Sequence, residues 1–419
     1  GPHHEKEGSY YTIKQLWSPI QIMNTSIDRQ FDGKFSVENR YDYLNLNTCR
    51  FLWKQVKFPQ ATDASNTAAQ VLKEGEVQGS DVAAHSAGVL DIKTNILANT
   101  DALYLTAIDK YGHELWRWTF PVDKLNQQTE PISLLSIRPT YTETENDLTV
   151  KANKRTFIFS KKDGQLKGVS VDNRKISFAN GPRFIGARRA DRSLDQFYNH
   201  DDEKAKEKDR TYSEFPDAAV FTKLDVKQDG GDLIVTANYK LGNLDKAQWT
   251  ISPSGDLVLD YTYNFSGVVD LMGICFDYPE DQVISKRWLG AGPYRVWQNR
   301  IHGTQYDVWE NDYNDPIPGE TFTYPEFKGY FGDVSWMNIR TKEGIISLTN
   351  ETPDAYVGIY QPRDGRDRLL YTLPESGISL LNVIPPVRNK VNSTDLCGPS
   401  SQPKWVNGPQ TGRIVFRFM

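Results

Sequence analysis

The strongest constraint on the fold is the regular recurrence of apolar residues in the second half of the chain. Apolar side chains occupy every second position of residues 233–241 and of residues 257–265, with a Ser254-Gly255 turn signal before the second run. A period of two sends successive side chains to opposite faces of a β-strand. Strands with one apolar face are typical of antiparallel sheets, so this half is predicted to be a large β-sandwich.

Shorter strand-like runs fill the first part of the chain. Residues 10–58 alternate as strands do, with an Asp32-Gly33 hairpin signal between two runs. Residues 102–108 and 115–120 are a further pair of apolar runs across a turn. About six or seven short strands of this kind suggest an immunoglobulin-like sandwich over residues 10–122. Residues 123–146 are polar and lose periodicity, which predicts a linker before a second domain at 147–419.

Composition narrows the class of partner. The chain has 419 residues, a formal net charge of -5 and 12% aromatic residues. A mildly acidic chain is a poor match for a phosphate backbone, so no nucleic-acid partner is predicted. It contains no apolar run of the roughly 20 residues that a membrane span needs, so no membrane partner is predicted.

Cysteine and histidine spacing predicts no cofactor and no metal. Cys49, Cys275 and Cys397 lie far apart, and the histidines lack ligand spacing. The cysteines are expected to be buried thiols, although one disulfide pair remains open.

Residues 287–336 form an aromatic-rich stretch with twelve Trp, Tyr and Phe residues among Gly, Pro, charged and amide residues. Its Gly-Pro, Asp-Pro and Pro-Gly steps predict a long, structured surface loop between strands. Flat rings beside planar polar groups suit a sugar ring, whereas the alternative is that the rings only anchor the loop. The candidate sugar contacts in this stretch are Tyr294, Arg295, Trp297, His302, Trp309 and Glu326.

Three carboxylates, Glu280, Glu320 and Glu326, lie in or near this stretch. Glycoside hydrolysis requires two carboxylates at a defined separation. None of the three sits in a motif typical of acid–base chemistry, so no catalytic residue is assigned. Arg189 and Asp191 lie in a separate basic cluster, GPRFIGARRADRS. Its Arg side chains suit acidic sugars, although salt bridges to neighbouring acids are the favoured interpretation.

Four segments, taken in order, resemble the region that follows the catalytic barrel in the β-galactosidase family, glycoside hydrolase family 2. They are YYTIKQLWSPIQI with FDGKFSVENRYDYLNL, LTVKANKRTFIFSKKDGQLKGVSVDNRKI with GPRFIGARRADRS, WLGAGPYRVWQNR, and YPEFKGYFGDVSWMNI. The third departs from the family pattern at Tyr294, Val296 and Trp297. The resemblance implies that residues 10–122 are an immunoglobulin-like domain and that 147–419 are a galactose-mutarotase-like β-supersandwich. Residues 1–9 would be a tag or the connection from the barrel.

The resemblance also implies a function. Trp405, in CGPSSQPKWVNG, matches a family Trp that stacks under a sugar in the leaving-group subsite. The barrel and its two catalytic Glu have no counterpart in this sequence, so a non-catalytic part of an exo-glycosidase is expected. Its implied partners are a galactoside or complex polysaccharide and the catalytic barrel, and a homo-oligomer is left open. A bacterial periplasmic or secreted location is favoured.

Two other functions stay open at this point. The first is an independent carbohydrate-binding protein that uses the same aromatic residues. The second is a mutarotase-like epimerase or lyase, for which Glu280, Glu326 and His302 are the only acid–base candidates.

Overall fold

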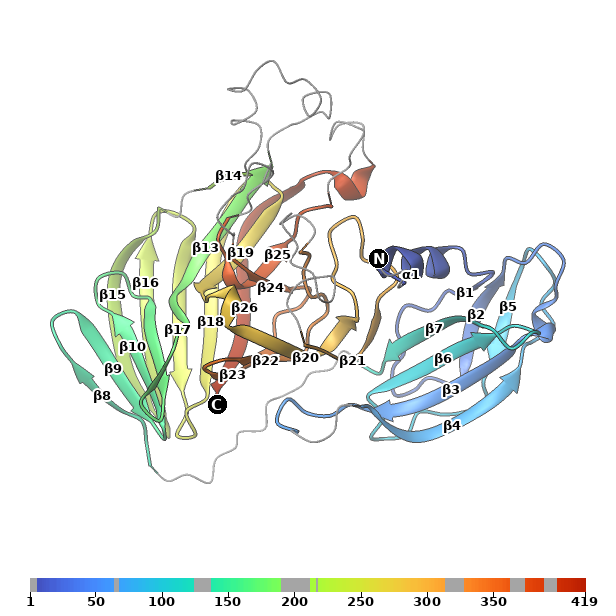
Figure 1. The fold of residues 1–419 in the computed structure, drawn as a ribbon, viewed down its shortest axis with the longest axis horizontal. Helices are drawn as coiled ribbons and strands as arrows, with labels where there is room; N and C mark the ends of the chain where they lie inside the picture. The colour runs from blue at the N-terminus through green and yellow to red at the C-terminus, as the bar shows by residue number, and fades with distance from the viewer. Residues whose placement is uncertain are drawn as a thin grey trace, which may run out of the picture. The chain divides into compact units, whose positions relative to one another are not determined.

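A computed structural model describes residues 6–63, 68–123, 137–189, 212–215, 218–312, 328–361, 374–387 and 398–419 (Figure 1). These residues are almost entirely antiparallel β-structure, with one α-helix and three short 3-10 turns in the described part. The all-β prediction is therefore confirmed. No helix in the described ranges is long and apolar enough to cross a membrane.

The chain divides into two compact units. The first comprises residues 1–128 together with 288–294 and 301–310, and the second comprises 129–287, 295–300 and 311–419. Two segments of the aromatic-rich stretch thus belong to the first unit, which its position in the sequence did not indicate. The predicted domain boundaries at residues 122 and 147 stay predictions.

The first unit is a sandwich of two sheets. One sheet has the order β1-β2-β5 and the other β4-β3-β6-β7. Their bounds are β1 Ile20–Ile22, β2 Lys34–Asn39, β3 Arg50–Lys57, β4 Gln70–Gln78, β5 Ser86–Asp91, β6 Ala102–Ile108 and β7 Glu114–Pro121. One hydrophobic core joins the two sheets, with Phe35 and Leu90 from the first and Phe51 and Leu103 from the second.

The start of this unit corrects the predicted strands. Residues Gly8–Leu16 form helix α1, where strands were expected from residue 10. Ile13 and Leu16 are three positions apart, which fits one face of a helix and does not fit a period of two. Both side chains are about half exposed, at 49% each, so the helix buries no strong apolar stripe in the described structure.

The second unit has two large antiparallel sheets. The first has the order β24-β25-β19-β13-β11-β10-β9-β8, with β12 beside β11 and β14 beside β13. Its bounds are β8 Thr140–Glu143, β9 Asp147–Ala152, β10 Arg155–Ser160, β11 Leu166–Val171, β12 Arg174–Ile176, β13 Ala179–Arg189, β14 Tyr212–Glu214, β19 Leu271–Asp277, β24 Tyr356–Tyr360 and β25 Gly377–Val383. Strand β8 lies inside the predicted linker 123–146 and pairs with β9.

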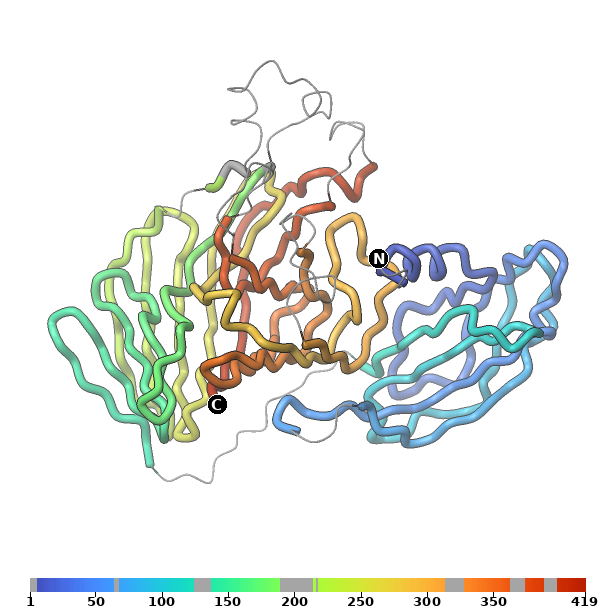
Figure 2. The backbone as a smooth tube through the Cα atoms, in the orientation of Figure 1, coloured from blue at the N-terminus to red at the C-terminus, as the bar shows by residue number. Residues whose placement is uncertain are grey.

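The second sheet has the order β15-β16-β17-β18-β26-β23-β22-β20-β21, and residues 288–292 of β20 and 305–310 of β21 are the part of it that is counted with the first unit. Its bounds are β15 Val220–Asp229, β16 Asp232–Lys240, β17 Leu244–Ile251, β18 Leu257–Val269, β20 Val283–Gly292, β21 Gln305–Asn311, β22 Trp336–Thr341, β23 Gly344–Asn350 and β26 Lys404–Phe418. Strand β26 runs beside β18 for most of its length, as the backbone trace also shows (Figure 2).

Aromatic rings fill the core between these two sheets. The ring of Phe276 on β19 stacks on Phe178 at 4.6 Å and meets Phe416 on β26 at 5.5 Å. The alternating residues of β18 point into this core, because Leu257, Leu259 and Tyr263 have no exposed surface. The period-two pattern therefore predicted the correct buried face.

The aromatic-rich stretch differs from the predicted surface loop. Trp288 in β20 and Trp336 in β22 are fully buried, and β21 crosses the middle of the stretch. Trp297 and Phe331 are also buried, at 6% and 2% exposure. In these positions the rings anchor the backbone, which was the alternative interpretation. Residues 313–327 lie outside the described residues, and Glu320 and Glu326 lie with them.

Candidate functional site

The predicted contact residues fall in separate places. Tyr294, His302 and Trp309 belong to the first unit, whereas Arg295, Trp297 and Trp405 belong to the second. Arg189 ends strand β13, and its side chain is outside the described part of the structure. Asp191 and Glu326 also lie outside the described residues.

The three residues in the first unit take part in local contacts. The Tyr294 hydroxyl donates to the Lys6 carbonyl at 3.0 Å, and its ring lies 5.1 Å from the Tyr11 ring. The Trp309 indole N–H donates to the carbonyls of Gly290 and Gln305 at 3.2 and 3.0 Å. The backbone carbonyl of His302 accepts from Thr12 at 2.8 Å. These contacts fix the segments within the first unit.

Arg295 belongs to a buried ion-pair cluster of the second unit, made of Glu280, Arg295, Lys328, Phe331 and Gln361. Lys328 Nζ lies 2.9 Å from Glu280 Oε1, and the two side chains are 6% and 7% exposed. Glu280 Oε2 accepts from the Gln361 N–H at 2.9 Å. Arg295 Nη1 donates to the Lys328 carbonyl at 2.9 Å, and its guanidinium lies 5.0 Å from the Phe331 ring centroid.

Both oxygens of Glu280 are therefore engaged by protein groups. The ion pair and the hydrogen bond hold the Glu280 carboxylate in one position. These contacts connect Glu280 to the segments that carry Lys328 and Gln361, which is a structural role.

The two amides that follow Trp297 hold the turn that precedes β26. Gln298 Nε2 donates to the carbonyls of Ser400 and Gln402 at 3.0 and 2.6 Å. Asn299 Nδ2 donates to Ser401 Oγ at 3.0 Å. The accepting residues Ser400 and Ser401 belong to the 3-10 turn Pro399–Ser401, and Gln402 follows it directly. The turn ends three positions before β26 begins. Side chains about 100 positions earlier in the chain thus fix where β26 starts.

Trp405 is the second residue of β26 and lies across from Val268 of β18. Its side chain is 71% exposed, whereas Trp249, Trp297 and Trp336 of the same unit are buried. An exposed aromatic ring indicates a contact surface more strongly than a buried ring does, because burying the ring in the fold would have been favourable. Trp405 therefore presents a free aromatic face on a strand whose start is fixed.

A groove of about 300 Å³ lies on the same sheet, near the other end of the β18 and β26 pairing. Most of the residues that line it are polar or charged. The lining residues are Lys246, Gln248, Asp260, Tyr261, Thr262, Glu351, Thr352, Pro353, Thr411, Gly412 and Arg413. We refer to it as the β26 groove.

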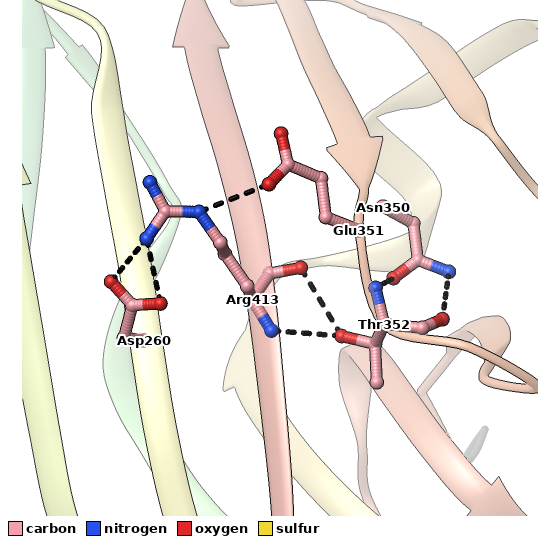
Figure 3. Close-up of polar contacts among 5 residues, drawn as sticks. All are labelled: Asp260, Asn350, Glu351, Thr352 and Arg413. Atoms are coloured by element: carbon pink, nitrogen blue, oxygen red, sulfur yellow. Dashed lines mark hydrogen bonds and ion pairs between the residues drawn. The ribbon is translucent and has the colours of Figure 1, made fainter. Parts of the chain in front are cut away.

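Arg413 organises the β26 groove (Figure 3). Its Nη1 donates to both oxygens of Asp260, at 2.7 and 2.6 Å, and its Nε donates to Glu351 at 3.0 Å. Partial burial opposes the charge of Arg413, but the hydrogen bonds and charges of Asp260 and Glu351 outweigh it and raise the Arg413 pKa. The backbone N–H of Arg413 also donates to Thr352 Oγ1 at 2.9 Å.

Sequence reasoning missed this groove. Asp260 and Thr262 occupy the polar positions of the alternating β18 pattern, which identifies an outward face and carries no further signal. Only the register, which sets Asp260 opposite Arg413, brings the charged partners together.

The described residues contain no group of three or more His, Cys, Asp and Glu side chains that could hold a metal ion. Cys49 and Cys275 are buried and form no disulfide. Cys397 lies outside the described residues.

The fold and the outward-facing groups on β26 define an all-β protein built from antiparallel sandwiches with a polar, Trp-bearing sheet face. Residues 151–381 match the model of the beta-galactosidase small chain family. This match covers more than half of the chain, and the chain belongs to that family. The resemblance to the β-galactosidase family is thus confirmed over these residues.

Solved structures also show similarity. Galactose 1-epimerase from Lactobacillus acidophilus is 10% identical, with a TM-score of 0.36, and the match covers 68% of this chain and 99% of the epimerase. The cycloalternan-forming enzyme from Listeria monocytogenes is 9% identical, with a TM-score of 0.21, and the match covers 97% of this chain and 31% of that enzyme. A search of curated proteins found no matching relative.

Proposed function

We propose that this chain is a non-catalytic part of a family 2, β-galactosidase-like exo-glycosidase and shapes its substrate entrance by aromatic stacking. The family membership of residues 151–381 supports a role in carbohydrate degradation. In this proposal the partners are a galactoside or a complex polysaccharide and the catalytic barrel portion of the same enzyme. The chemistry belongs to carboxylates of that barrel portion.

The observation that carries the proposal is the free face of Trp405, which is 71% exposed. An indole face packs against the CH face of a sugar ring, while the hydroxyls of the sugar remain available to polar groups. Because Gln298 and Asn299 hold the turn before β26, the ring is already positioned when the sugar arrives. Such preorganisation lowers the entropic cost of binding.

The other predicted contacts take supporting roles in this proposal. Arg295 and Trp297 are 8% and 6% exposed and lie three positions and one position before Gln298, the first of the two turn-holding amides. They fix the backbone that holds the turn, and Trp405 alone contacts the sugar.

The test is hydrolysis of nitrophenyl β-galactoside by the whole chain, alone and mixed with the catalytic barrel portion. We expect turnover only in the mixture. Nitrophenyl β-glucuronide and β-mannoside, run in parallel, identify the sugar. Turnover by the chain alone would overturn the non-catalytic assignment, and sugar binding at millimolar or tighter affinity by the chain alone would favour the independent binding protein.

A substitution then tests Trp405 itself. Trp405→Ala should raise KM in the mixture by roughly threefold to tenfold, with a smaller change in kcat, since stacking is worth about 0.5–1.5 kcal/mol beyond area burial. Trp405→Phe should recover part of the loss. The matched control is Tyr43→Ala, because Tyr43 is 94% exposed in the first unit. Equal KM values for Trp405→Ala and the control would show that Trp405 does not stack on substrate.

A further inference from the structure

The apolar side of helix α1 points away from the first unit, to which the helix belongs. Its four exposed apolar side chains, at 44%, 49%, 49% and 80% exposure, are Tyr10, Ile13, Leu16 and, directly after the helix, Trp17. At about 100° per residue, these positions fall within an arc of about 120° on a helix. They therefore form one continuous stripe, which we refer to as the α1 face.

The opposite side of the helix is polar and holds it on the first unit. Thr12 Oγ1 donates to the His302 carbonyl at 2.8 Å. Gln15 Oε1 accepts from the Gly303 N–H at 2.6 Å. These residues are half-buried, unlike the four apolar ones. Hydrogen bonds of polar side chains thus attach the helix to the unit.

Two further contacts fix the direction in which the α1 face points. Gly303 has a φ of +89°, and a Cβ added there would lie 2.4 Å from the Thr12 backbone nitrogen. The absence of a side chain at 303 therefore lets the helix backbone approach closely. On β7, the Glu114 carboxylate pairs with Lys14 Nζ at 3.0 Å. With these contacts in place, the helix cannot turn its apolar side inward without breaking them.

This orientation is the reverse of the usual one. A surface helix normally turns its apolar stripe to the core and its polar side to water. Covering the exposed apolar side chains would be favourable, and a contiguous exposed apolar patch marks an interaction site. The α1 face is therefore a surface that a partner covers.

The size of the α1 face argues against a second copy of this chain as that partner. The helix has nine residues, which is about 14 Å of length. Its four side chains expose on the order of 500 Å² together, given the size of buried aromatic side chains. Two copies that met only through this face would bury less than the roughly 1,200–2,000 Å² of a stable interface.

We infer that the α1 face docks on the catalytic barrel portion of the enzyme, against an apolar stripe on a helix of its outer ring. The inference rests on the proposed function for the existence of this partner, but it does not require Trp405. Helices form the outer ring of a (β/α)8 barrel, and apolar side chains three and four positions apart pack into the grooves of a second helix. Because the barrel portion belongs to the same enzyme, the α1 face needs to supply only part of the contact.

The test is the affinity of the whole chain for the catalytic barrel portion, measured by titration calorimetry. The combined variant is Ile13→Gln, Leu16→Gln and Trp17→Gln, since Gln is a good helix former. Tyr10 is left unchanged, because Lys6 Nζ lies 4.9 Å from its ring centroid. We expect the Kd to rise at least about a hundredfold, because each apolar side chain that is no longer buried costs a severalfold to tenfold factor.

The matched control replaces three exposed apolar residues of the first unit outside the helix. Tyr43, Val89 and Tyr111 are 94%, 52% and 72% exposed. Their combined replacement by Gln should leave the Kd at the wild-type value. Both variants should keep the wild-type midpoint of urea unfolding, since the side chains that they change are exposed in the fold.

The outcomes separate this inference from the proposed function. Wild-type affinity of the α1 variant, with turnover intact in the mixture, would overturn the inference and leave the proposed function standing. Neither binding nor turnover with the wild-type chain would overturn both.

Two other occupants are distinguished with the chain alone. A dimer in sedimentation equilibrium that the α1 variant loses would assign the face to a second copy. A lower urea midpoint of the α1 variant would assign it to a contact within the chain. Either result would overturn the inference.

Discussion

Two of the clusters of Arg or Lys with Glu or Asp in the second unit differ mainly in exposure. In the buried ion-pair cluster, Glu280 and Lys328 are 7% and 6% exposed. In the β26 groove, the Arg413 side chain is 47% exposed, Asp260 36% and Glu351 27%. Similar chemical groups lie at similar distances in both places. Exposure to water is therefore the property that distinguishes the two clusters.

Because the first cluster is buried, its charged groups depend on one another for stability. A buried charge is stable only while its partners remain, because the interior cannot solvate it. The charges of the open groove keep access to solvent, so their mutual attraction is screened and contributes little to folding.

The largest effect should come from breaking the buried pair. Lys328→Met leaves the Glu280 carboxylate buried without its cation, and we expect a loss of about 3–5 kcal/mol in the free energy of unfolding. Urea unfolding at pH 7 measures it. The control is Lys223→Met, since the Lys223 side chain is 63% exposed in its pair with Asp225.

The double variant Glu280→Gln with Lys328→Met removes both charges and should regain much of that stability. If Lys328→Met costs no more than Lys223→Met, burial is not what distinguishes the two clusters.

An intermediate effect should appear at alkaline pH at Tyr261, whose side chain lies on the buried face of β18. The Tyr261 pKa is raised by burial to about 12, so the protonated phenol stabilises the folded state fully below about pH 10, and this contribution is lost as pH rises through 12. Relative to Tyr261→Phe, the wild type should therefore lose about 1 kcal/mol by pH 11. Denaturant unfolding from pH 8 to 11 measures the difference.

The matched control for this profile is Tyr111→Phe, whose side chain is 72% exposed. It should follow the wild-type curve. A constant difference between wild type and Tyr261→Phe across the whole range would contradict a buried phenol at this position.

The smallest effect on stability should follow removal of the groove arginine. Arg413→Met breaks ion pairs that are largely solvated, and we expect a change in the free energy of unfolding of about 1 kcal/mol or less. Thermal unfolding at low and high salt measures it, and the difference from wild type should shrink as salt rises. A loss as large as that of Lys328→Met would erase the contrast between the two clusters.

The fold was predictable where the signal is local. The alternation in β16 and β18 identified the buried face directly, because a strand sets it within a few residues. Residues 10–17 were wrongly predicted as strand for the same reason, because a few apolar positions fit both the period of a strand and that of a helix. The family relation followed from ordered segments, each of which says little alone.

The candidate site was less predictable because distant segments build it. Trp405 was found by resemblance, but the amides of Gln298 and Asn299 that hold its turn gave no signal in the sequence. The β26 groove depends on the register of three strands and on the residues that follow β23. Trp288 and Trp336 looked like surface rings because the stretch between them is rich in Gly, Pro and polar residues, whereas both belong to strands.

The position of β26 also has a consequence for biosynthesis. This strand lies between β18 and β23 in its sheet, although it follows both of them in the sequence by more than 50 residues. On the ribosome, β15 to β18 emerge long before the strand that joins them to β23. Until residues 404–418 have been released, the edge of β18 is unpaired and able to bind other chains. The second unit is therefore expected to complete its folding late and to depend on protection of that edge in the interval.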